Sequence, residues 1–312
     1  MLKHIFISVF LSIILLFGPV SAFEQLFDAA ITFNGLSGPH SVTTADFNGD
    51  EILDLAVANY NSDCVSVFLA TSLGEYNMHS DYSTGAGPKY IISADLNSDG
   101  IIDLATANQN SDDVSILMGN GNGTFSAPSN YPVQNGPCSI VIDNFDDNST
   151  KDLAVTNRYS DNVSILLGNG DGTFNTPLEN SIGEYPVSLI SGDFNHDSFQ
   201  DLAVANNYSH DISILSGNGD GTFSTEVRCP VGQYPQSIAS CDFNEDGDLD
   251  LAVANRGSDS LSVLLGIGNG SFNSATNYLS GGAGSQPHCI IPVDTDGDSI
   301  MDIAVANTGT DN

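Results

Sequence analysis

The chain has 312 residues, with 39 acidic residues against 6 basic ones and a net charge of −33. A surface of this charge repels phosphate groups, which argues against nucleic acids and anionic membranes as partners. Hydrophobic residues make up 40% of the chain, so the composition also excludes a disordered acidic tail.

The first 22 residues have the pattern of a secretory signal peptide. Lys3 gives a positive start, Ile5 to Phe17 form an apolar run, and Val20-Ser21-Ala22 offer small residues for cleavage. The run of 13 residues is too short to cross a membrane comfortably as a helix. We therefore expect a secreted, extracellular protein that starts near Phe23 and has no membrane span after cleavage. An uncleaved anchor is the alternative.

A nine-residue acidic segment occurs six times in the rest of the chain. Its first residues are 49 positions apart, except for a last interval of 52. A fixed period of about 50 residues is typical of repeat architectures such as propellers. The six segments, which we call the acidic loops, span residues 46–54, 95–103, 144–152, 193–201, 242–250 and 294–302.

The fifth repeat shows which elements surround an acidic loop. An apolar run at Pro235 to Ser240 precedes the loop, and alternating apolar runs at Leu251 to Asn255 and Leu261 to Leu265 follow it. Ser271-Phe272 is expected to open a fourth strand. Because no segment between loops has ten residues of helical period, we predict an all-β fold of six antiparallel four-stranded blades. A plain β-sandwich is the alternative.

Two further residue types recur at fixed distances from the acidic loop. A proline stands seven residues before each loop, where it suits the start of a first strand because it has no backbone donor. An asparagine is expected to close each second strand, since it tolerates turn geometry. These residues are Pro39, Pro88, Pro137, Pro186, Pro235 and Pro287, and Asn59, Asn108, Asn157, Asn206, Asn255 and Asn307.

The acidic loops carry oxygen side chains at positions 1, 3, 5 and 9, and these positions hold 18 of the 39 acidic residues. Ca²⁺ is a hard cation that takes six to eight oxygen ligands, so the pattern predicts a Ca²⁺ site in each loop, with position 7 adding a backbone carbonyl. The predicted ligands are Asp46, Asn48, Asp50, Ile52 and Asp54; Asp95, Asn97, Asp99, Ile101 and Asp103; Asn144, Asp146, Asn148, Thr150 and Asp152; Asp193, Asn195, Asp197, Phe199 and Asp201; Asp242, Asn244, Asp246, Asp248 and Asp250; and Asp294, Asp296, Asp298, Ile300 and Asp302.

The six loops are not equivalent. The third has the neutral amides Asn144 and Asn148 where the other loops have carboxylates, so we predict that it binds Ca²⁺ most weakly, with Asp143 as a neighbouring acid that compensates in part. A helical EF-hand is the alternative reading of the pattern. It requires a glutamate at position 12, where the first and fifth loops have Val57 and Val253.

At these residues the chain resembles the FG-GAP and VCBS repeat proteins, the family of the integrin α-subunit N-terminal propeller. The likeness rests on the runs Asp-Phe-Asn-x-Asp-x-x-x-Asp-Leu-Ala-Val-Ala-Asn and Val-Ser-Ile-Leu-x-Gly-Asn-Gly-Asp-Gly-Thr-Phe, which the fourth repeat carries at Asp193 to Asn206 and Ile212 to Phe223. The resemblance covers residues 24–312. It implies one β-propeller domain over residues 23–312, with Ca²⁺ in the loop between the first and second strands of a blade.

The chain departs from this family in its number of repeats. Such propellers usually have seven blades, whereas six acidic loops are present and the last repeat stops at Asn312, after its second strand. We expect a fragment of a longer protein or an incomplete gene product, with Glu24 to Phe33 as a fourth strand of the last blade. Closure with an incomplete blade is the alternative.

The function that the resemblance implies is extracellular adhesion or ligand binding, with an unknown protein or glycan as the partner. Ca²⁺ is the only expected cofactor, and recognition is expected in variable turns such as Asn77 to Gly87 and Ser280 to Gln286. We expect no enzyme, because the Ca²⁺ sites account for nearly all identifiable carboxylates. An extracellular polysaccharide lyase or hydrolase, and a purely structural surface repeat, are the alternatives.

Overall fold

The structure is a computed structural model, which describes residues 12–14, 33, 35–72 and 75–309. The chain divides into two compact units. The first unit comprises residues 1–10, 16–140 and 168–174, and the second comprises residues 11–15, 141–167 and 175–312. Each unit is described by itself below.

Five four-stranded antiparallel sheets correspond to the first five repeats, and in each sheet the strands are neighbours in chain order. The sheets are β2 (Pro39–Ala45), β3 (Asp54–Asn59), β4 (Cys64–Phe68) and β7 (Ser80–Ser83); β8 (Pro88–Ala94), β9 (Asp103–Asn108), β10 (Asp113–Leu117) and β11 (Ser129–Pro132); β12 (Pro137–Asp143), β13 (Asp152–Asn157), β14 (Asn162–Leu166) and β15 (Leu178–Ser181); β16 (Pro186–Gly192), β17 (Asp201–Asn206), β18 (Asp211–Leu215) and β19 (Val227–Pro230); and β20 (Pro235–Cys241), β21 (Asp250–Asn255), β22 (Ser260–Leu264) and β23 (Thr276–Leu279). The prediction of antiparallel four-stranded blades is confirmed for these repeats.

The sixth repeat forms a smaller sheet. Its strands β24 (Pro287–Val293) and β25 (Asp302–Asn307) are joined by β1 (Ser12–Ile14), which runs antiparallel to β25. The expected strand at Glu24 to Phe33 lies outside the described residues, apart from Phe33, which is in no strand. The remaining elements are a hairpin of β5 (Ala70–Ser72) and β6 (Glu75–Tyr76) and the short 3₁₀ helix η1 (Arg256–Ser258).

Burial explains why the second strand of each sheet has its sequence. All six residues of β3, β9, β13, β17 and β21 are buried, whereas the fourth strands are largely exposed. The sequence of a strand that is covered on both faces is a nearly continuous apolar run, as in Leu-Ala-Val-Ala. Small alanines alternate with larger side chains, which lets neighbouring sheets approach closely.

The fourth strand of the fifth repeat starts later than the sequence predicted. It begins at Thr276, and Phe272 forms only an isolated bridge to Gly266. The ring of Phe272 instead meets the ring of Phe194 at a centroid distance of 5.6 Å, in the core between the fourth and fifth sheets. An apolar side chain that enters the core from a loop is thus easily mistaken for the start of a strand.

The repeated prolines and asparagines lie where the sequence predicted them. Each proline begins a first strand and each asparagine ends a second strand. The pairing register shifts directly after the proline, for example between Pro186 and Ser188 and between Pro235 and Ser237. This irregularity is expected where a residue without a backbone donor starts a ladder.

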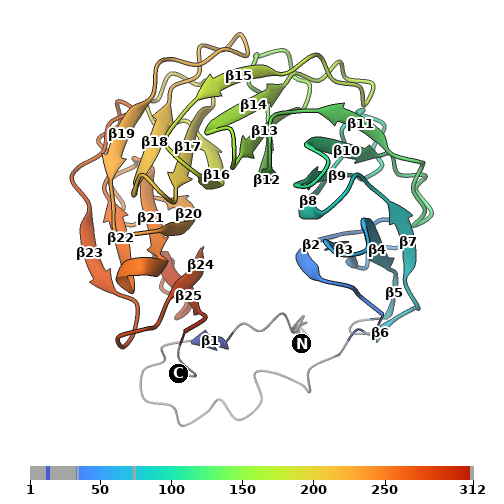
Figure 1. Cartoon of the computed structure of the whole chain (residues 1–312), viewed down its shortest axis with the longest axis horizontal. Helices are drawn as coiled ribbons and strands as arrows, with labels where there is room; N and C mark the ends of the chain where they lie inside the picture. The colour runs from blue at the N-terminus through green and yellow to red at the C-terminus, as the bar shows by residue number, and fades with distance from the viewer. Residues whose placement is uncertain (1–11, 15–32, 34, 73–74, 310–312) are drawn as a thin grey trace. The chain divides into compact units, whose positions relative to one another are not determined.

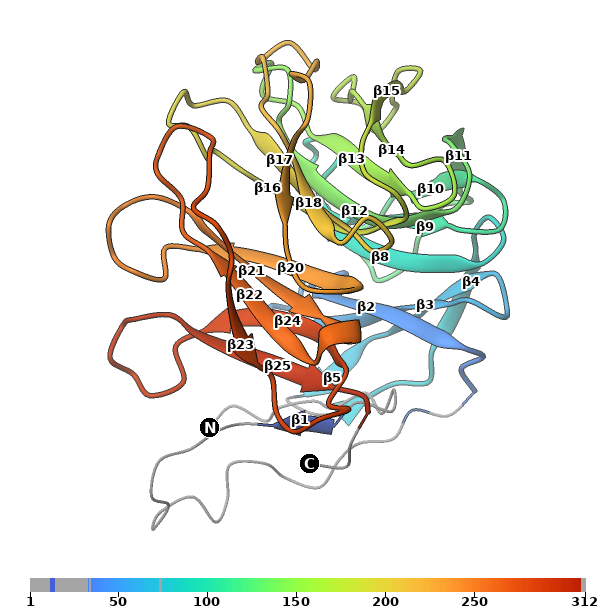
Figure 2. The same cartoon turned by 60° about the vertical axis from the view of Figure 1, so that its left-hand side comes forward.

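In the second unit, the antiparallel strands place two kinds of connection at opposite strand ends. First strands β16 and β20 lie side by side, as do β20 and β24 (Figure 1). The acidic loops join β16 to β17, β20 to β21 and β24 to β25, and they project on one side of this unit (Figure 2). The turns that follow β17 and β21 therefore lie at the other ends of these strands.

Candidate functional site

The backbone of every acidic loop has two residues in the left-handed region, at positions 4 and 6. In the fifth loop these are Glu245, with φ of 60°, and Gly247, with φ of 92°. Position 6 is glycine in the second and fifth loops, as its φ favours, and serine or glutamate in the other four. All six loops thus share one backbone shape, whatever residue occupies position 6.

The carboxylate at position 1 organises the loop through backbone hydrogen bonds. In the fifth loop, Asp242 accepts hydrogen bonds from the N–H groups of Asp246 at 3.2 Å and Gly247 at 2.9 Å. Asn244 Oδ1 accepts a hydrogen bond from the N–H of Asp246 at 2.9 Å, and Asp246 accepts one from Asp248 N–H at 2.9 Å. The second and fourth loops repeat these contacts, so the oxygens at positions 1, 3 and 5 are held along one tight turn.

The carboxylate at position 9 connects the loop to its blade. Asp250 is fully buried, and its two oxygens accept hydrogen bonds from the N–H groups of Phe243 at 2.9 Å and Gly266 at 2.8 Å. The equivalent Asp54, Asp103 and Asp201 make the same pair of contacts. Burial raises the pKa of Asp250, and that of Asp201 to about 6. Position 9 therefore has a structural role besides the predicted ligand role.

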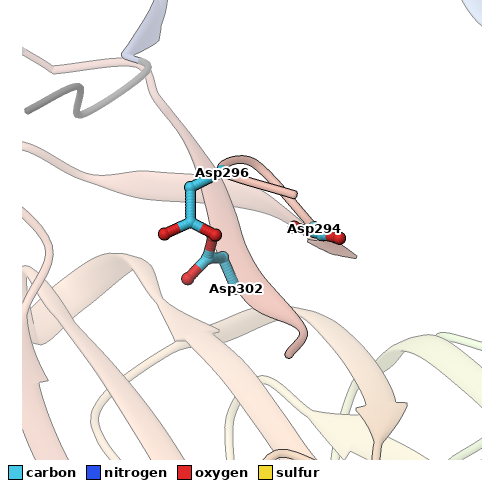
Figure 3. A group of neighbouring side chains, drawn as sticks. All are labelled: Asp294, Asp296 and Asp302. Carbon is cyan, nitrogen blue, oxygen red and sulfur yellow. The ribbon is translucent and has the colours of Figure 1, made fainter. Parts of the chain in front are cut away.

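The sixth loop differs in that its position 9 is exposed. Asp302 accepts hydrogen bonds from the N–H and the hydroxyl of Thr295, and these contacts lower its pKa. Carboxylate oxygens of Asp294, Asp296 and Asp302 lie within 4.8 Å of one another (Figure 3). Two oxygens that bind one Ca²⁺ at 2.3–2.6 Å are separated by at most about 5 Å, so this donor set fits a single calcium ion.

The third loop lacks the anchor at position 1. Asn144 Oδ1 is buried and has no hydrogen-bond partner in the part of the chain that the structure describes, whereas Asp46 at the same position of the first loop accepts four backbone hydrogen bonds. Asp143, the acid expected to compensate, accepts hydrogen bonds from the N–H of Asn144 and the hydroxyl of Ser191. Weak Ca²⁺ binding at this loop stays a prediction, which calorimetric titration of single-loop variants will test.

A glycine-rich turn of the next blade is hydrogen-bonded to the acidic loop. Gly270 N–H donates to the carbonyl of Phe194 at 2.9 Å, and Gly221 N–H donates to the carbonyl of Phe145 at 2.9 Å. The fourth and fifth loops are also in direct contact, since His196 Nε2 lies 2.8 Å from Asp248 Oδ1. A change in the rigidity of one loop is therefore transmitted through these hydrogen bonds to the adjacent blade.

The other ends of the same strands line an open pocket of about 550 Å³ in the second unit, which we call the tyrosine–arginine pocket. Its aromatic residues are adjacent. The rings of Tyr185 and Tyr208 are stacked at 4.1 Å, and Tyr208 meets Tyr234 at 6.4 Å. Tyr208 and Tyr234 are 54% and 44% exposed, so aromatic faces remain available to a ligand. The pocket is lined by Arg158, Tyr185, Val187, Asn207, Tyr208, Tyr234, Gln236, Arg256, Gly257, Asp259, Gly284 and Gln286.

Two of these tyrosines occupy backbone positions that favour glycine. Tyr185 and Tyr234 precede the proline of a first strand and have φ of 59° and 52°. The first three repeats have glycine at this position, namely Gly38, Gly87 and Gly136 with φ of 64°, 66° and 73°. A side chain in the left-handed region is disfavoured by about 1–2 kcal/mol. Residues held in such conformations cluster at binding and active sites, which makes the pocket a candidate site.

The pocket holds two of the six basic residues of the chain. The Arg158 guanidinium carbon lies 4.9 Å from the centre of the Tyr185 ring, and its buried Nε has no hydrogen-bond partner among the described residues. Arg256 donates from Nη2 to Gln286 Oε1 at 3.2 Å. Asp259 accepts hydrogen bonds from the N–H groups of Gln286 and Gly284, which lower its pKa.

No motif in the sequence marks this pocket, apart from the variable turn at Ser280 to Gln286, which supplies Gly284 and Gln286. The signal that would have shown it is a difference between repeats. At the position before the repeated proline, glycine gives way to Tyr185 and Tyr234. At the position after the repeated asparagine, the third and fifth repeats have Arg158 and Arg256.

Comparison with known proteins identifies the repeat. The FG-GAP-like repeat family matches residues 144–204, 193–253 and 242–305, which together span half of the chain. The chain belongs to the FG-GAP-like repeat family. The predicted resemblance is confirmed over this range, and no curated protein sequence matches the chain.

Solved structures with this arrangement of blades share low sequence identity with the chain. BBS1N, solved in complex with ARL6DN, aligns with a TM-score of 0.60 at 16% identity over 88% of this chain and 78% of its own. An Agrocybe aegerita lectin that recognises non-reducing terminal N-acetylglucosamine aligns with a TM-score of 0.60 at 18% identity, over 86% of this chain and 74% of the lectin. The Pseudomonas aeruginosa periplasmic gluconolactonase aligns with a TM-score of 0.59 at 16% identity, over 76% of this chain and 69% of the gluconolactonase. The FG-GAP-like protein therefore has an all-β propeller fold.

These neighbours correct one expectation. The prediction that the chain is not an enzyme is wrong as an inference from its architecture, because the same fold carries a gluconolactonase. The many carboxylates assigned to Ca²⁺ do not settle the matter, since the tyrosine–arginine pocket contains polar side chains that the loops do not use. Within the described residues, no helix has both the length and the apolar character needed to cross a membrane.

Proposed function

We propose that this FG-GAP-like protein is a secreted, Ca²⁺-stabilised propeller that acts as an extracellular binding module for a protein or glycan. The observation that carries the proposal is the placement of Tyr185 and Tyr234 in glycine-favouring conformations at one pocket. A local conformation that opposes folding is retained where it serves function. Aromatic and arginine side chains also dominate the binding energy of many recognition sites.

The acidic loops would supply stability to this module. Carboxylate and amide oxygens at positions 1, 3 and 5, as in Asp242, Asn244 and Asp246, would hold Ca²⁺ together with position 9 and the carbonyl of position 7. Each carboxylate oxygen of Asp250 accepts one backbone hydrogen bond and keeps a lone pair for a metal. Six bound ions would reduce the net charge from −33 to about −21 and so relieve repulsion.

The printed functions of the neighbours are compatible with such a module. One neighbour is a lectin and another was solved in a protein complex, so this fold supports both glycan and protein recognition. At 16–18% identity, the likeness concerns the fold and transfers neither ligand to this chain.

A binding array tests the proposal. The full chain would be screened against glycans and extracellular proteins in millimolar Ca²⁺ and in chelator, beside the double variant Tyr185→Gly/Tyr234→Gly. We expect ligands that the wild type retains and the double variant loses. Ligands that the variant binds as well as the wild type does would contradict a role for the pocket. If no ligand bound to either protein, a structural repeat would be favoured.

The same array addresses catalysis. Because the fold also carries a gluconolactonase, every retained saccharide should be incubated with the protein and analysed for cleavage. Turnover that depends on Tyr185 and Tyr234 would identify the pocket as the active site of a lyase or hydrolase.

A further inference from the structure

We propose that the tyrosine–arginine pocket binds a saccharide that carries a carboxylate, such as a uronic acid. This assignment rests on the proposed binding function and specifies its ligand class.

The aromatic residues favour a sugar over a peptide. Tyr185, Tyr208 and Tyr234 form a continuous row, and the exposed aromatic surface of Tyr208 and Tyr234 suits contact with the C–H groups of a sugar ring. Among the lining residues only Val187 is aliphatic, so the pocket offers few apolar contacts for the side chains of a peptide. The side-chain amides of Gln236 and Gln286 are suited to hydroxyl groups, whereas that of Asn207 is buried and donates to the carbonyl of Pro235.

The position of Arg158 favours an anionic group. Its guanidinium carbon lies 4.9 Å from the centre of the Tyr185 ring, and a guanidinium that packs on an aromatic face can still donate its N–H groups to an anion. Its buried Nε needs an acceptor, because a buried donor without a partner costs about 1–3 kcal/mol. A carboxylate accepts two parallel hydrogen bonds from a guanidinium and satisfies this donor.

The overall negative charge does not prevent anion binding at this end of the strands. A six-residue strand such as β17 is about 20 Å long, and the Debye length at physiological salt is about 8 Å, so charges on the acidic loops are largely screened at the pocket. Within the pocket, Arg158 and Arg256 face one acid, Asp259, whose oxygens already accept two backbone hydrogen bonds. Near the pocket, Asp161 accepts a hydrogen bond from Tyr185 N–H. A ligand with few carboxylates therefore fits better than a dense polyanion.

Calorimetry with matched saccharides tests the assignment on the full chain in millimolar Ca²⁺. The probes are short oligomers of galacturonic, glucuronic and mannuronic acid, the neutral oligomer that corresponds to each, and a glutamate-rich peptide. We expect at least one uronate to bind tenfold or more tightly than its neutral counterpart. In the Arg158→Gln variant, the ratio of the affinity for the uronate to the affinity for its neutral counterpart should fall about tenfold. This change corresponds to the loss of one charge-assisted hydrogen bond.

Two controls separate the charge effect from loss of structure. Lys151→Gln also removes one positive charge from the second unit, but Lys151 lies in an acidic loop and outside the pocket, so this variant should keep the wild-type preference. Tyr185→Gly and Tyr234→Gly should lose affinity for acidic and neutral oligomers alike. Their melting temperatures should stay close to that of the wild type, since glycine suits both backbone positions.

The outcomes distinguish the two proposals. Equal, tyrosine-dependent binding of acidic and neutral oligomers would overturn the carboxylate assignment and leave the binding module intact. Preference for the acidic peptide would overturn the saccharide assignment. No binding of any uronate, combined with tyrosine-dependent capture of another ligand on the array, would overturn this inference alone, whereas an empty array would overturn both.

Discussion

In the second unit, the two ends of the same strands differ in how uniformly the repeats are built. At the acidic-loop end, the loops share one backbone shape and one pattern of oxygen side chains, although position 6 is glycine in only two of them. At the pocket end, two positive-φ positions carry Tyr185 and Tyr234, although three other repeats use glycine there. The acidic-loop end thus repeats one design with local variation, whereas the pocket end changes from glycine to a large aromatic residue between repeats.

The end that repeats should govern stability, and the end that varies should govern recognition. Contacts that most repeats share, such as those of Asp201 and Asp250, are what a structural role requires. Contacts found in one or two repeats cannot hold every blade together, but they can distinguish one ligand from another. Four predictions test this division.

Removal of Ca²⁺ should produce the largest change. At a free Ca²⁺ concentration ten times the dissociation constant, each site adds about 1.4 kcal/mol to the free energy of unfolding, so several sites together should raise the melting temperature by roughly 10 °C or more. Calorimetric melting with Ca²⁺, with chelator and with an equal concentration of Mg²⁺ measures the effect. Identical melting curves in Ca²⁺ and chelator would exclude a stabilising metal at the loops.

Replacement of a buried position 9 should affect stability even in chelator. Asp250→Ala leaves the N–H groups of Phe243 and Gly266 without their acceptor, which should lower the free energy of unfolding by about 3 kcal/mol. The exposed Asp302 is the matched control, and Asp302→Ala should have a clearly smaller effect. Urea denaturation of both variants provides the measurement, and equal losses would refute a special structural role for the buried carboxylates.

At the pocket end, Gly257→Ala should impair binding more than stability. A Cβ atom at Gly257 would collide with Cδ2 of Tyr234, so the ring must move away from the row of tyrosines. We expect about a tenfold loss of ligand affinity, which corresponds to about 1.4 kcal/mol, and a much smaller change in melting temperature. The control is Gly247→Ala, because a Cβ at Gly247 meets no atom within 4 Å and lies in an acidic loop. If Gly247→Ala weakened ligand binding as much as Gly257→Ala, the two ends would not be separable.

The smallest expected effect concerns pH in the absence of Ca²⁺. Burial raises the pKa of Asp201 to about 6 from an ordinary value of 3.8, so the folded state holds this proton more tightly than the unfolded state. The resulting stabilisation is fully present below about pH 4 and is lost as the pH rises through about 6. The melting temperature in chelator should therefore fall as the pH rises over this range. It should fall less in the Asp201→Asn variant. With Ca²⁺ bound, the trend should reverse, because the metal requires the ionised carboxylate.

The sequence was sufficient to predict the features that repeat. Six copies of one pattern identify the acidic loops, the first-strand prolines such as Pro186 and the terminal asparagines such as Asn206, since each position is read six times. The pocket could not be predicted in the same way. Its residues come from turns and first strands of four successive repeats, and each of them, such as Tyr208 or Gln236, is unremarkable by itself.

The sequence also could not distinguish two roles of one residue type. Aspartate at position 9 is required for the calcium pattern, but Asp54 is equally required as the acceptor for the N–H groups of Phe47 and Ala70. Only the burial of the carboxylate and the direction of these backbone donors show the second role. The strand predicted at Phe272 is a similar case. An apolar residue after a turn fits a strand and a core-filling loop equally well.

The hydrogen bond from a glycine-rich turn to the loop of the preceding blade affects how the second unit should come apart. Gly221 and Gly270 tie the third and fourth loops to the next blade, so melting of one blade removes a contact from its neighbour. Nearest-neighbour coupling of this kind makes repeat arrays lose their structure in a concerted manner. An ion that stiffens one bend would then protect adjacent repeats against proteases, although it touches none of them.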